Sequence, residues 1–287
     1  MGNKVSNRIL VTGATGFIGK HLVQKLKDSG HVVYSLSKSL GYDVCDNTVF
    51  SDFLDKDIDI VFHLAGCTFV PNSWEDPYSY YYTNILGTQI TLEFCRKTNT
   101  KMIFISAYVY GVPKYLPIDE NHPVAPNNPY THSKCLAEEL CAFYAREMGV
   151  QTIVLRPFNL YGPGQDKHFL IPELINQINR NGEIVVKDDV PRRDYLHICD
   201  FVEACISAIN TTDRFIVFNI GYGASLSVKE IVELLIENSG KNIKWRSLNE
   251  KRKNEIPDTI ADCTAIKKRL GWEPRLSFID SICGLMD

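Results

Sequence analysis

Short hydrophobic runs alternate along most of the chain with longer stretches of helical spacing. Six of these runs are candidate strands, at residues 8–12, 32–36, 60–64, 101–106, 151–156 and 216–220. They are hydrophobic almost without interruption, which is typical of strands that are covered on both faces. Between them hydrophobic residues recur at helical spacing, as at Leu136, Leu140 and Phe143. The alternation predicts an α/β fold with a doubly wound parallel sheet.

A glycine-rich turn joins the first candidate strand to the helix that follows it. Gly13, Gly16 and Gly19 are three residues apart, a spacing that permits a tight turn and close backbone approach to a pyrophosphate. The alternative is a strand-to-helix turn that binds nothing. Its place between strand and helix favours a Rossmann-type dinucleotide site. The expected contacts are Gly13, Thr15, Gly16, Phe17, Ile18 and Gly19.

The end of the second candidate strand indicates which nicotinamide cofactor is accepted. An acid at this place would accept a hydrogen bond from the ribose 2′-hydroxyl and repel a 2′-phosphate. The chain instead has Ser37 and Lys38, which suit a 2′-phosphate. NADP(H) is therefore favoured over NAD(H). The alternative, a solvated surface role for Lys38, leaves NAD(H) open.

Tyr130 and Lys134 lie four residues apart in a stretch of helical pattern, so they occupy one face of a helix. A nearby ammonium lowers the pKa of a phenol, so we expect the pKa of Tyr130 to fall from about 10 toward neutrality. Such a phenol can donate or accept a proton at a reacting oxygen. Ser106, at the end of the fourth candidate strand, could share that oxygen. The alternative is an ordinary amphipathic helix on which this spacing has no catalytic meaning.

Composition and charge narrow the classes of partner. A net charge of −3 and a pI near 6.2 provide no basic face, so nucleic acid is not an expected partner. No run is long enough to span a membrane, and the start of the chain lacks a signal-peptide pattern. The nine cysteines include no Cys-x-x-Cys pair, which indicates reduced thiols in the cytoplasm. No spacing of ligating residues favours a metal.

Several motifs occur together in an order known from one family. They are the glycine turn, His63-Leu64-Ala65, Asn84 with Gly87-Thr88, Ser106, the Tyr130/Lys134 pair, Asn159 and Arg193-Asp194-Tyr195-Leu196-His197. On these motifs, from about Arg8 to about Trp272, the chain resembles an extended short-chain dehydrogenase/reductase. The resemblance is to the NAD(P)-dependent nucleotide-sugar epimerase/dehydratase group, whose members act on a nucleotide-linked sugar.

The resemblance implies a role for each matching residue. Ser106 and Tyr130 would handle the proton on the sugar oxygen, and Lys134 would also hold the nicotinamide ribose. The remaining cofactor contacts would be Leu64, Ala65, Val44 and Asp43, the last at the adenine. The nucleotide sugar would contact Thr68, Phe69, Asn159, His168, Arg193 and Arg252, with both arginines at its pyrophosphate. Surface salt bridges are the alternative for the arginines, and exposure to solvent is the alternative for His168.

The resemblance also implies a homodimer that forms through helices matching residues 78–96 and 130–148. His63 is expected to support the end of its strand rather than to react. These expectations come from the family pattern and not from residue spacing.

Two departures from the family pattern narrow the reaction. Dehydratases have an Asp-Glu pair where this chain has Ala107 and Tyr108, and GDP-fucose synthases have a cysteine base where it has Tyr108. Both chemistries are therefore disfavoured. We expect an oxidoreductase that reduces the 4-keto group of a 4-keto-6-deoxyhexose nucleotide, with a C4 epimerase that retains NAD as the alternative. A remoter alternative is a non-catalytic dinucleotide sensor, against which the complete Ser106, Tyr130 and Lys134 set argues.

The pattern becomes less regular from about Leu160 and richer in glycine, proline and charge. This change predicts a smaller second lobe. We expect residues 1–159 and 194–222 to form the dinucleotide-binding domain, and residues 160–193 and 223–287 to form the substrate lobe.

Overall fold

The computed structural model describes residues 6–180, 182–251 and 255–285. The chain divides into two compact units. The first unit comprises Met1–Val109, Val124–Arg156 and Val202–Phe218, and the second comprises Tyr110–Pro123, Pro157–Phe201 and Asn219–Asp287.

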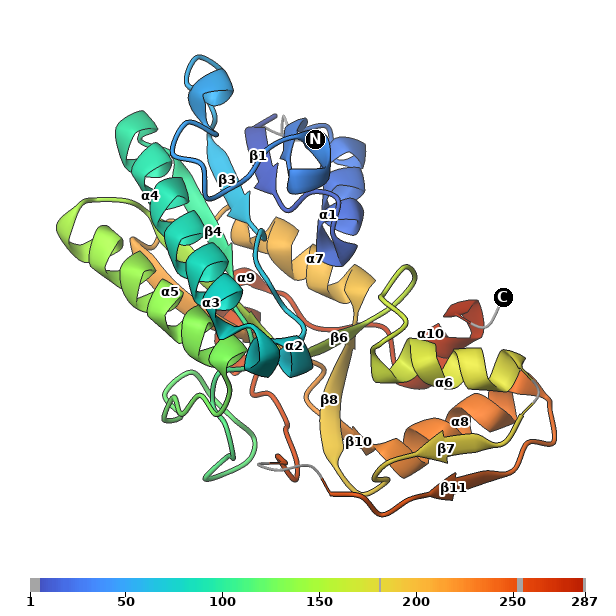
Figure 1. The fold of residues 1–287 in the computed structure, drawn as a ribbon. Coiled ribbons are helices and arrows are strands. Elements are labelled where there is room, and N and C mark those ends of the chain that lie inside the picture. The colour runs from blue at the N-terminus through green and yellow to red at the C-terminus, as the bar shows by residue number, and fades with distance from the viewer. Residues whose placement is uncertain (1–5, 181, 252–254, 286–287) are drawn as a thin grey trace. The chain divides into compact units, whose positions relative to one another are not determined.

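A six-stranded sheet is the centre of the predicted fold (Figure 1), with its strands in the order β2-β1-β3-β4-β5-β9. Their bounds are β1 Arg8–Thr12, β2 Val32–Leu36, β3 Ile60–His63, β4 Lys101–Ile105, β5 Thr152–Pro157 and β9 Phe215–Ile220. All six predicted strands are confirmed to within one residue at each end, and the pairs from β2 through β5 are parallel. Strand order reverses at β1, so the carboxyl ends of β1 and β3 frame the usual ligand crevice of such sheets.

Helices cover both faces of this sheet, as its unbroken hydrophobic strands require. Figure 1 shows α4 (Gly87–Thr98) and α5 (Pro129–Glu147) side by side along one face. Leu10 of β1 and Phe104 of β4 share one buried cluster with Leu92 of α4. α1 (Phe17–Asp28) and α7 (Ile198–Ala208) are joined by an ion pair between Lys25 and Glu203.

A π-helical turn precedes α4. The segment runs through α2 (Val70–Glu75), α3 (Pro77–Tyr81) and the π turn η3 (Tyr82–Leu86). Asn84 is buried in this turn, and its amide bonds the backbone N–H (2.8 Å) and C=O (3.1 Å) of Cys67 and the hydroxyl of Ser133 (2.8 Å). The turn thereby connects the loop after β3 to α5.

The second unit contains two small sheets, one ordered β10-β8-β6 and one pairing β11 with β7. Its elements are β6 Asn159–Tyr161, α6 Leu170–Asn179, β7 Ile184–Val186, β8 Arg192–His197, β10 Ser225–Ser227, α8 Val228–Ser239, β11 Trp245–Ser247, α9 Thr264–Leu270, α10 Phe278–Ile282 and the 3-10 turn η4 Cys283–Leu285. Ile178, Leu235 and Phe278 share its hydrophobic core. α8 begins at a capping box in which Ser227 and Glu230 bond reciprocally.

Two kinds of feature are absent from the described residues. Within the described ranges, no helix has the length and apolar character that crossing a bilayer requires. Over the same ranges, no cluster of three or more His, Cys, Asp or Glu side chains is placed to hold a metal ion.

Candidate active site

The glycine turn lies between β1 and α1, at the carboxyl edge of the sheet. Gly13 has a φ of +67°, and a Cβ there would lie 2.8 Å from the backbone nitrogen of Ala65. A Cβ at Gly19 would collide with the backbone of Gly13 and Ala14, because α1 packs closely on the turn. Gly16 is the N-cap of α1, so the first N–H groups of the helix are directed at this turn. The other predicted contacts, Thr15, Phe17 and Ile18, lie on the turn and the first helical residues.

Thr12 and His63 join this turn to the loop after β3. Thr12 Oγ1 accepts hydrogen bonds from the N–H groups of Leu64 (3.2 Å) and Ala65 (3.1 Å), and it lies 2.9 Å from His63 Nδ1. His63 Nε2 lies 3.1 Å from the Thr88 hydroxyl. Burial lowers the pKa of His63 to about 3. His63 is therefore a neutral support for the strand end, and Thr12, which it contacts, holds Leu64 and Ala65 beside the glycine turn.

Hydroxyl groups and a lysine follow the end of β2. Thr15 Oγ1 lies 3.1 Å from Ser37 Oγ. Lys38 begins the short 3-10 turn η1 (Lys38–Leu40), has 89% of its side chain exposed, and lies 3.6 Å from the Asp43 carboxylate. Val44 is buried. The segment directly after β2 thus presents hydroxyls and an ammonium, and its first acid, Asp43, is paired with that ammonium.

Tyr130 and Lys134 lie on one face at the start of α5, as the spacing predicts. The helix begins at Asn128, whose side chain caps it. Lys134 is buried, and its Nζ donates to the carbonyl of Ile105 at 2.6 Å and lies 4.4 Å from the ring centre of Phe104. The end of β4 therefore fixes the position of the ammonium.

The pKa values of this pair differ from the expectation. Burial lowers the pKa of Lys134 to about 8, while the charge of Glu138 opposes that change. Burial also raises the pKa of Tyr130 above its usual value, with a smaller contribution from Tyr80. The expected lowering of the Tyr130 pKa is therefore wrong for this structure, because removal of the phenol from water outweighs attraction to the ammonium. Tyr130 keeps its proton at neutral pH.

Ser106 belongs to a buried charged network. It lies directly after β4, and its hydroxyl donates a hydrogen bond to Oε1 of Glu138 on α5. Arg156 of β5 donates through Nε to both oxygens of the same carboxylate (3.0 and 3.1 Å) and through a terminal nitrogen to Oε2 (2.5 Å). All three residues are less than 10% exposed. Ser106, Tyr130 and Lys134 all lie in the first unit.

The loop after β3 contains the predicted sugar contacts. Thr68 is exposed and Phe69 is partly buried. The hydroxyl of Tyr80 donates to the Phe69 carbonyl at 2.5 Å, and the Tyr80 ring meets the Tyr130 ring edge-on at 6.2 Å between centres. Tyr80 therefore links this loop to the predicted proton donor.

The other predicted substrate contacts lie in the second unit. Asn159 begins β6, and its amide donates to the carbonyl of Asp194 at 3.4 Å. His168 is exposed beside the carboxylate of Asp166, 2.5 Å from Nδ1. Arg193 is partly buried, ion-paired with Glu255, and bonded to a backbone carbonyl at 2.6 Å. Arg252 lies outside the described residues.

Comparison with known proteins assigns the family. The sequence model of the NAD dependent epimerase/dehydratase family matches residues 9–221, well over half of the chain. The chain belongs to this family. As an epimerase/dehydratase family member it is an enzyme, and the resemblance found in the motifs is confirmed.

The relatives of this epimerase/dehydratase family member differ in reaction. A putative UDP-glucose 4-epimerase of Methanocaldococcus jannaschii is 33% identical, over 96% of this chain and 95% of that protein. The GDP-6-deoxy-D-mannose reductase of Pseudomonas aeruginosa is 29% identical, over 98% and 97%. The solved structure of RMD from Pseudomonas aeruginosa, complexed with NADPH, has a TM-score of 0.90 and 29% identity, and 98% of each chain is covered. The solved structure of a UDP-glucose 4-epimerase from Thermotoga maritima, with UDP-glucose, has a TM-score of 0.89 and 31% identity, and 96% of each chain is covered. These similarities support a nicotinamide dinucleotide as the cofactor.

Three residues near this family's triad were not found from the sequence. Glu138 and Arg156 surround Ser106, and Tyr80 contacts both Phe69 and Tyr130. A signal existed for Glu138, which lies one turn beyond Lys134 on the same helix face. Arg156 was also visible as a charge at the end of an otherwise hydrophobic strand. Nothing in the sequence distinguishes Tyr80 from the tyrosines beside it.

Proposed function

We propose that the protein is an NADPH-dependent reductase that converts the 4-keto group of a nucleotide-linked 6-deoxyhexose into a hydroxyl. The observation that carries this proposal is the end of β2, where Ser37 and Lys38 stand in place of an acid and the hydroxyl of Thr15, from the glycine turn, lies beside Ser37. Hydroxyls and an ammonium suit a 2′-phosphate, whereas an acid would repel it. A phosphorylated nicotinamide cofactor is normally supplied reduced, which favours reduction of the substrate.

The residues at the start of α5 can supply the proton that this reduction needs. The phenol of Tyr130, whose pKa burial raises, is protonated at neutral pH, which is the form that a proton donor needs. The neighbouring Lys134 ammonium would stabilise the phenolate that remains. The backbone cradle at Gly13 and Gly19, which a Cβ would fill, fits the pyrophosphate of a dinucleotide. When bound there, the cofactor supplies the hydride.

The second candidate function is that of a C4 epimerase, and the epimerases among the similar proteins support it. Several other relatives of about 30% identity are called UDP-glucose 4-epimerase. An epimerase would use the same three residues but keep its cofactor bound, and it would need Tyr130 to accept a proton before donating one.

An assay with both substrate classes separates the two functions. Purified protein is mixed with NADPH and nucleoside diphosphate 4-keto-6-deoxyhexoses, or with nucleotide hexoses and no added cofactor. A reductase consumes NADPH in equal amount to the keto sugar and leaves the hexoses unchanged. Protein that arrives with tightly held oxidised cofactor and interconverts 4-hydroxyl epimers, with no lasting absorbance change, would establish the epimerase instead.

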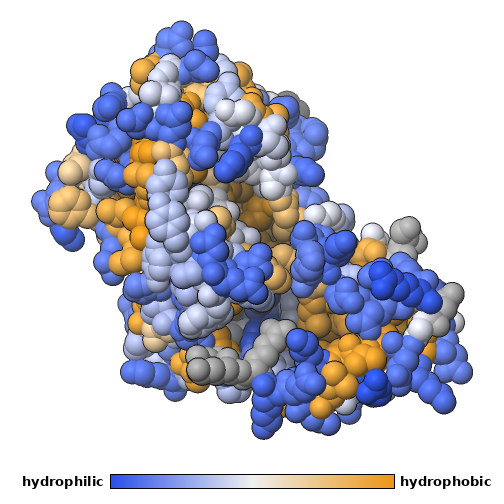
Figure 2. All heavy atoms as spheres, viewed as in Figure 1, coloured by the Kyte–Doolittle hydropathy of each residue, from blue (hydrophilic) through white to orange (hydrophobic). Residues whose placement is uncertain are grey.

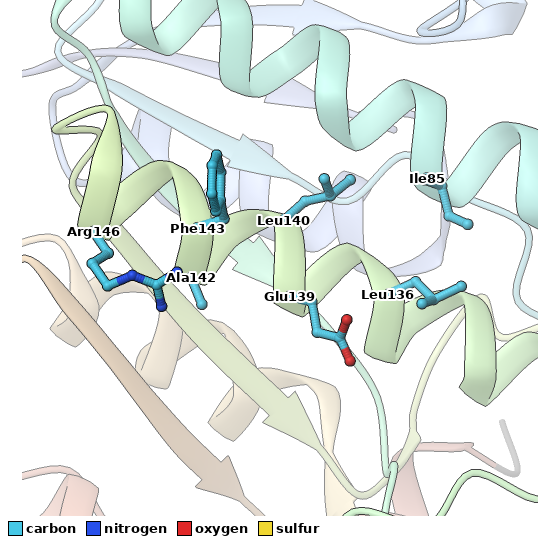
Figure 3. Close-up of a pocket in the computed structure, with 7 residues that line it drawn as sticks. All are labelled: Ile85, Leu136, Glu139, Leu140, Ala142, Phe143 and Arg146. Atoms are coloured by element: carbon cyan, nitrogen blue, oxygen red, sulfur yellow. The ribbon is translucent and has the colours of Figure 1, made fainter.

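We further propose that two copies pair through α4 and α5. Hydrophobic side chains reach the surface over these helices (Figure 2). Figure 3 shows a surface groove whose lining is Ile85 of η3 together with six residues of α5, Leu136, Glu139, Leu140, Ala142, Phe143 and Arg146. Tyr78 of α3 and Tyr82 of η3, which precede Ile85 in the sequence, stack on one another, and their side chains are 73% and 44% exposed. This α4–α5 face has the exposed apolar character of an interface.

The cysteines support a reducing location. Eight are free in the described part of the chain, of which Cys95, Cys135, Cys141 and Cys205 are buried. Free thiols are typical of compartments that keep cysteines reduced, so we propose that the protein works in the cytoplasm.

A further inference from the structure

The carboxylate of Glu138 connects the catalytic helix to two strands of the sheet. It lies two turns beyond Tyr130 on α5 and is less than 10% exposed. Arg156 of β5 holds both of its oxygens, which fixes the carboxylate plane. The same carboxylate accepts the hydrogen bond from Ser106. Arg156 therefore orients the Glu138 carboxylate, and the carboxylate in turn holds the Ser106 hydroxyl.

The hydrogen bond to Glu138 determines how the Ser106 side chain is oriented. A serine hydroxyl has one proton to donate and two lone pairs that accept. The proton of Ser106 is directed at Glu138, whose carboxylate is the stronger acceptor because it is charged. This bond fixes the orientation of the Ser106 side chain.

We infer that Glu138, anchored by Arg156, is a positioning residue that fixes the orientation of the Ser106 hydroxyl at the reacting sugar oxygen. The inference rests on the proposed function. In the proposed reduction Tyr130 supplies the proton to the 4-keto oxygen, and Glu138 keeps the Ser106 side chain in one orientation while it does so.

Glu138 acts on Lys134 as well. Its charge raises the pKa of Lys134 against the lowering effect of burial. Removal of the charge should therefore lower the pKa of Lys134 further below about 8. Because the proposed mechanism needs the ammonium, the alkaline limb of the kcat profile should move to lower pH in a neutral variant.

The test is a double-mutant cycle with Glu138→Gln and Ser106→Ala, measured by kcat and KM for NADPH-dependent reduction. In the wild-type background, Glu138→Gln should lower kcat about 10-fold with little change in KM, since the charge-assisted hydrogen bond that orients Ser106 becomes a weaker neutral one. At a pH well below the alkaline limb, where Lys134 is charged in every variant, the same substitution in the Ser106→Ala background should have almost no further effect on kcat. A purely structural role predicts equal losses in both backgrounds, and that outcome would overturn the inference.

Two controls keep the result interpretable. Glu138→Gln leaves Arg156 without its charged partner, so the variant with both Glu138→Gln and Arg156→Gln replaces the ion pair by two amides that can still bond. It should fold and show the same kcat defect. Glu138→Asp, which retains the charge, should restore the alkaline limb.

Failure of the proposed function is a separate outcome. If wild-type protein reduces no 4-keto sugar, the same cycle is run on the free energy of unfolding in urea. Coupling between Ser106 and Glu138 should then still appear. Additive unfolding energies would contradict the contact on which the inference depends.

Discussion

At the scale of single residues, burial determines the chemistry of the site more than sequence spacing does. Tyr130 and Lys134 have the expected spacing, yet burial raises the pKa of the first and lowers that of the second to about 8. At neutral pH the phenol is therefore protonated, which is the form that a proton donor needs, and the Lys134 ammonium loses its proton more easily than that of an exposed lysine. The spacing identified the two residues, and the surrounding packing sets their pKa values.

Replacement of Tyr130 by phenylalanine tests the proton donor. Tyr130→Phe should lower kcat about 100-fold or more, because the general acid is lost, while the ring and its packing stay. NADPH affinity, followed by fluorescence titration, should change little. Tyr115→Phe at an exposed tyrosine is the matched control. Turnover near the wild-type level in Tyr130→Phe would remove it from the mechanism.

His63 should make the protein sensitive to acid. Its pKa is about 3 in the folded protein against about 6.5 when unfolded, so unfolding takes up a proton at pH values between the two. The stability that it contributes is complete above pH 6.5 and is lost as pH falls toward 3. At pH 4.5 the loss should be about 3 kcal/mol relative to pH 7.5.

Urea unfolding at these two pH values measures this effect. His63→Gln should be less stable at pH 7.5, since bonds to Thr12 and Thr88 are weakened, but it should lose less stability at pH 4.5. His168→Gln, at an exposed histidine, should follow the wild type. An equally steep loss in His63→Gln would assign the acid sensitivity to other groups.

At the scale of elements, the segment after β2 should control cofactor choice. Lys38→Asp places a carboxylate where a 2′-phosphate would bind, so NADPH affinity should fall about 10-fold while NADH affinity is kept or improves. Fluorescence titration with both cofactors measures the ratio. Lys114→Asp, at another exposed lysine, should leave it unchanged. A wild-type preference for NADH would contradict our interpretation of this segment.

Many of the helices and strands could be predicted from the sequence, and those that could not were missed for physical reasons. The six central strands were found because strands buried on both faces have few polar residues, as at residues 101–105. The three-residue strands β6, β7, β10 and β11 are too short to leave a periodic pattern. Glu138 and Glu139 are neighbours of identical charge, and although the spacing from Lys134 marks the first, the packing of α5 on the sheet is what buries it and leaves the second exposed. Its role near Ser106 could not be obtained from the helix pattern.

At the scale of the whole molecule, subunit pairing is the property that follows from the α4–α5 face. Light scattering at micromolar concentration should give about twice the chain mass of 32.6 kDa. Phe143→Glu introduces a charge into the groove and should shift the mass toward that of the monomer. Val190→Glu, at an exposed residue of the second unit, is the control. A monomer mass for the wild-type protein would refute the pairing.

The π turn at Tyr82–Leu86 has a consequence for how this chain could vary in length. It holds one more residue than a regular helical turn would, and within it Asn84 binds Cys67 and Ser133 while its neighbour Ile85 lines the surface groove. Deletion of one residue would restore a regular helix but rotate one side of it by about 100° relative to the other. Either the amide would leave its partners or the isoleucine would leave the groove. Insertions and deletions, which surface loops tolerate, should therefore be excluded from these five positions.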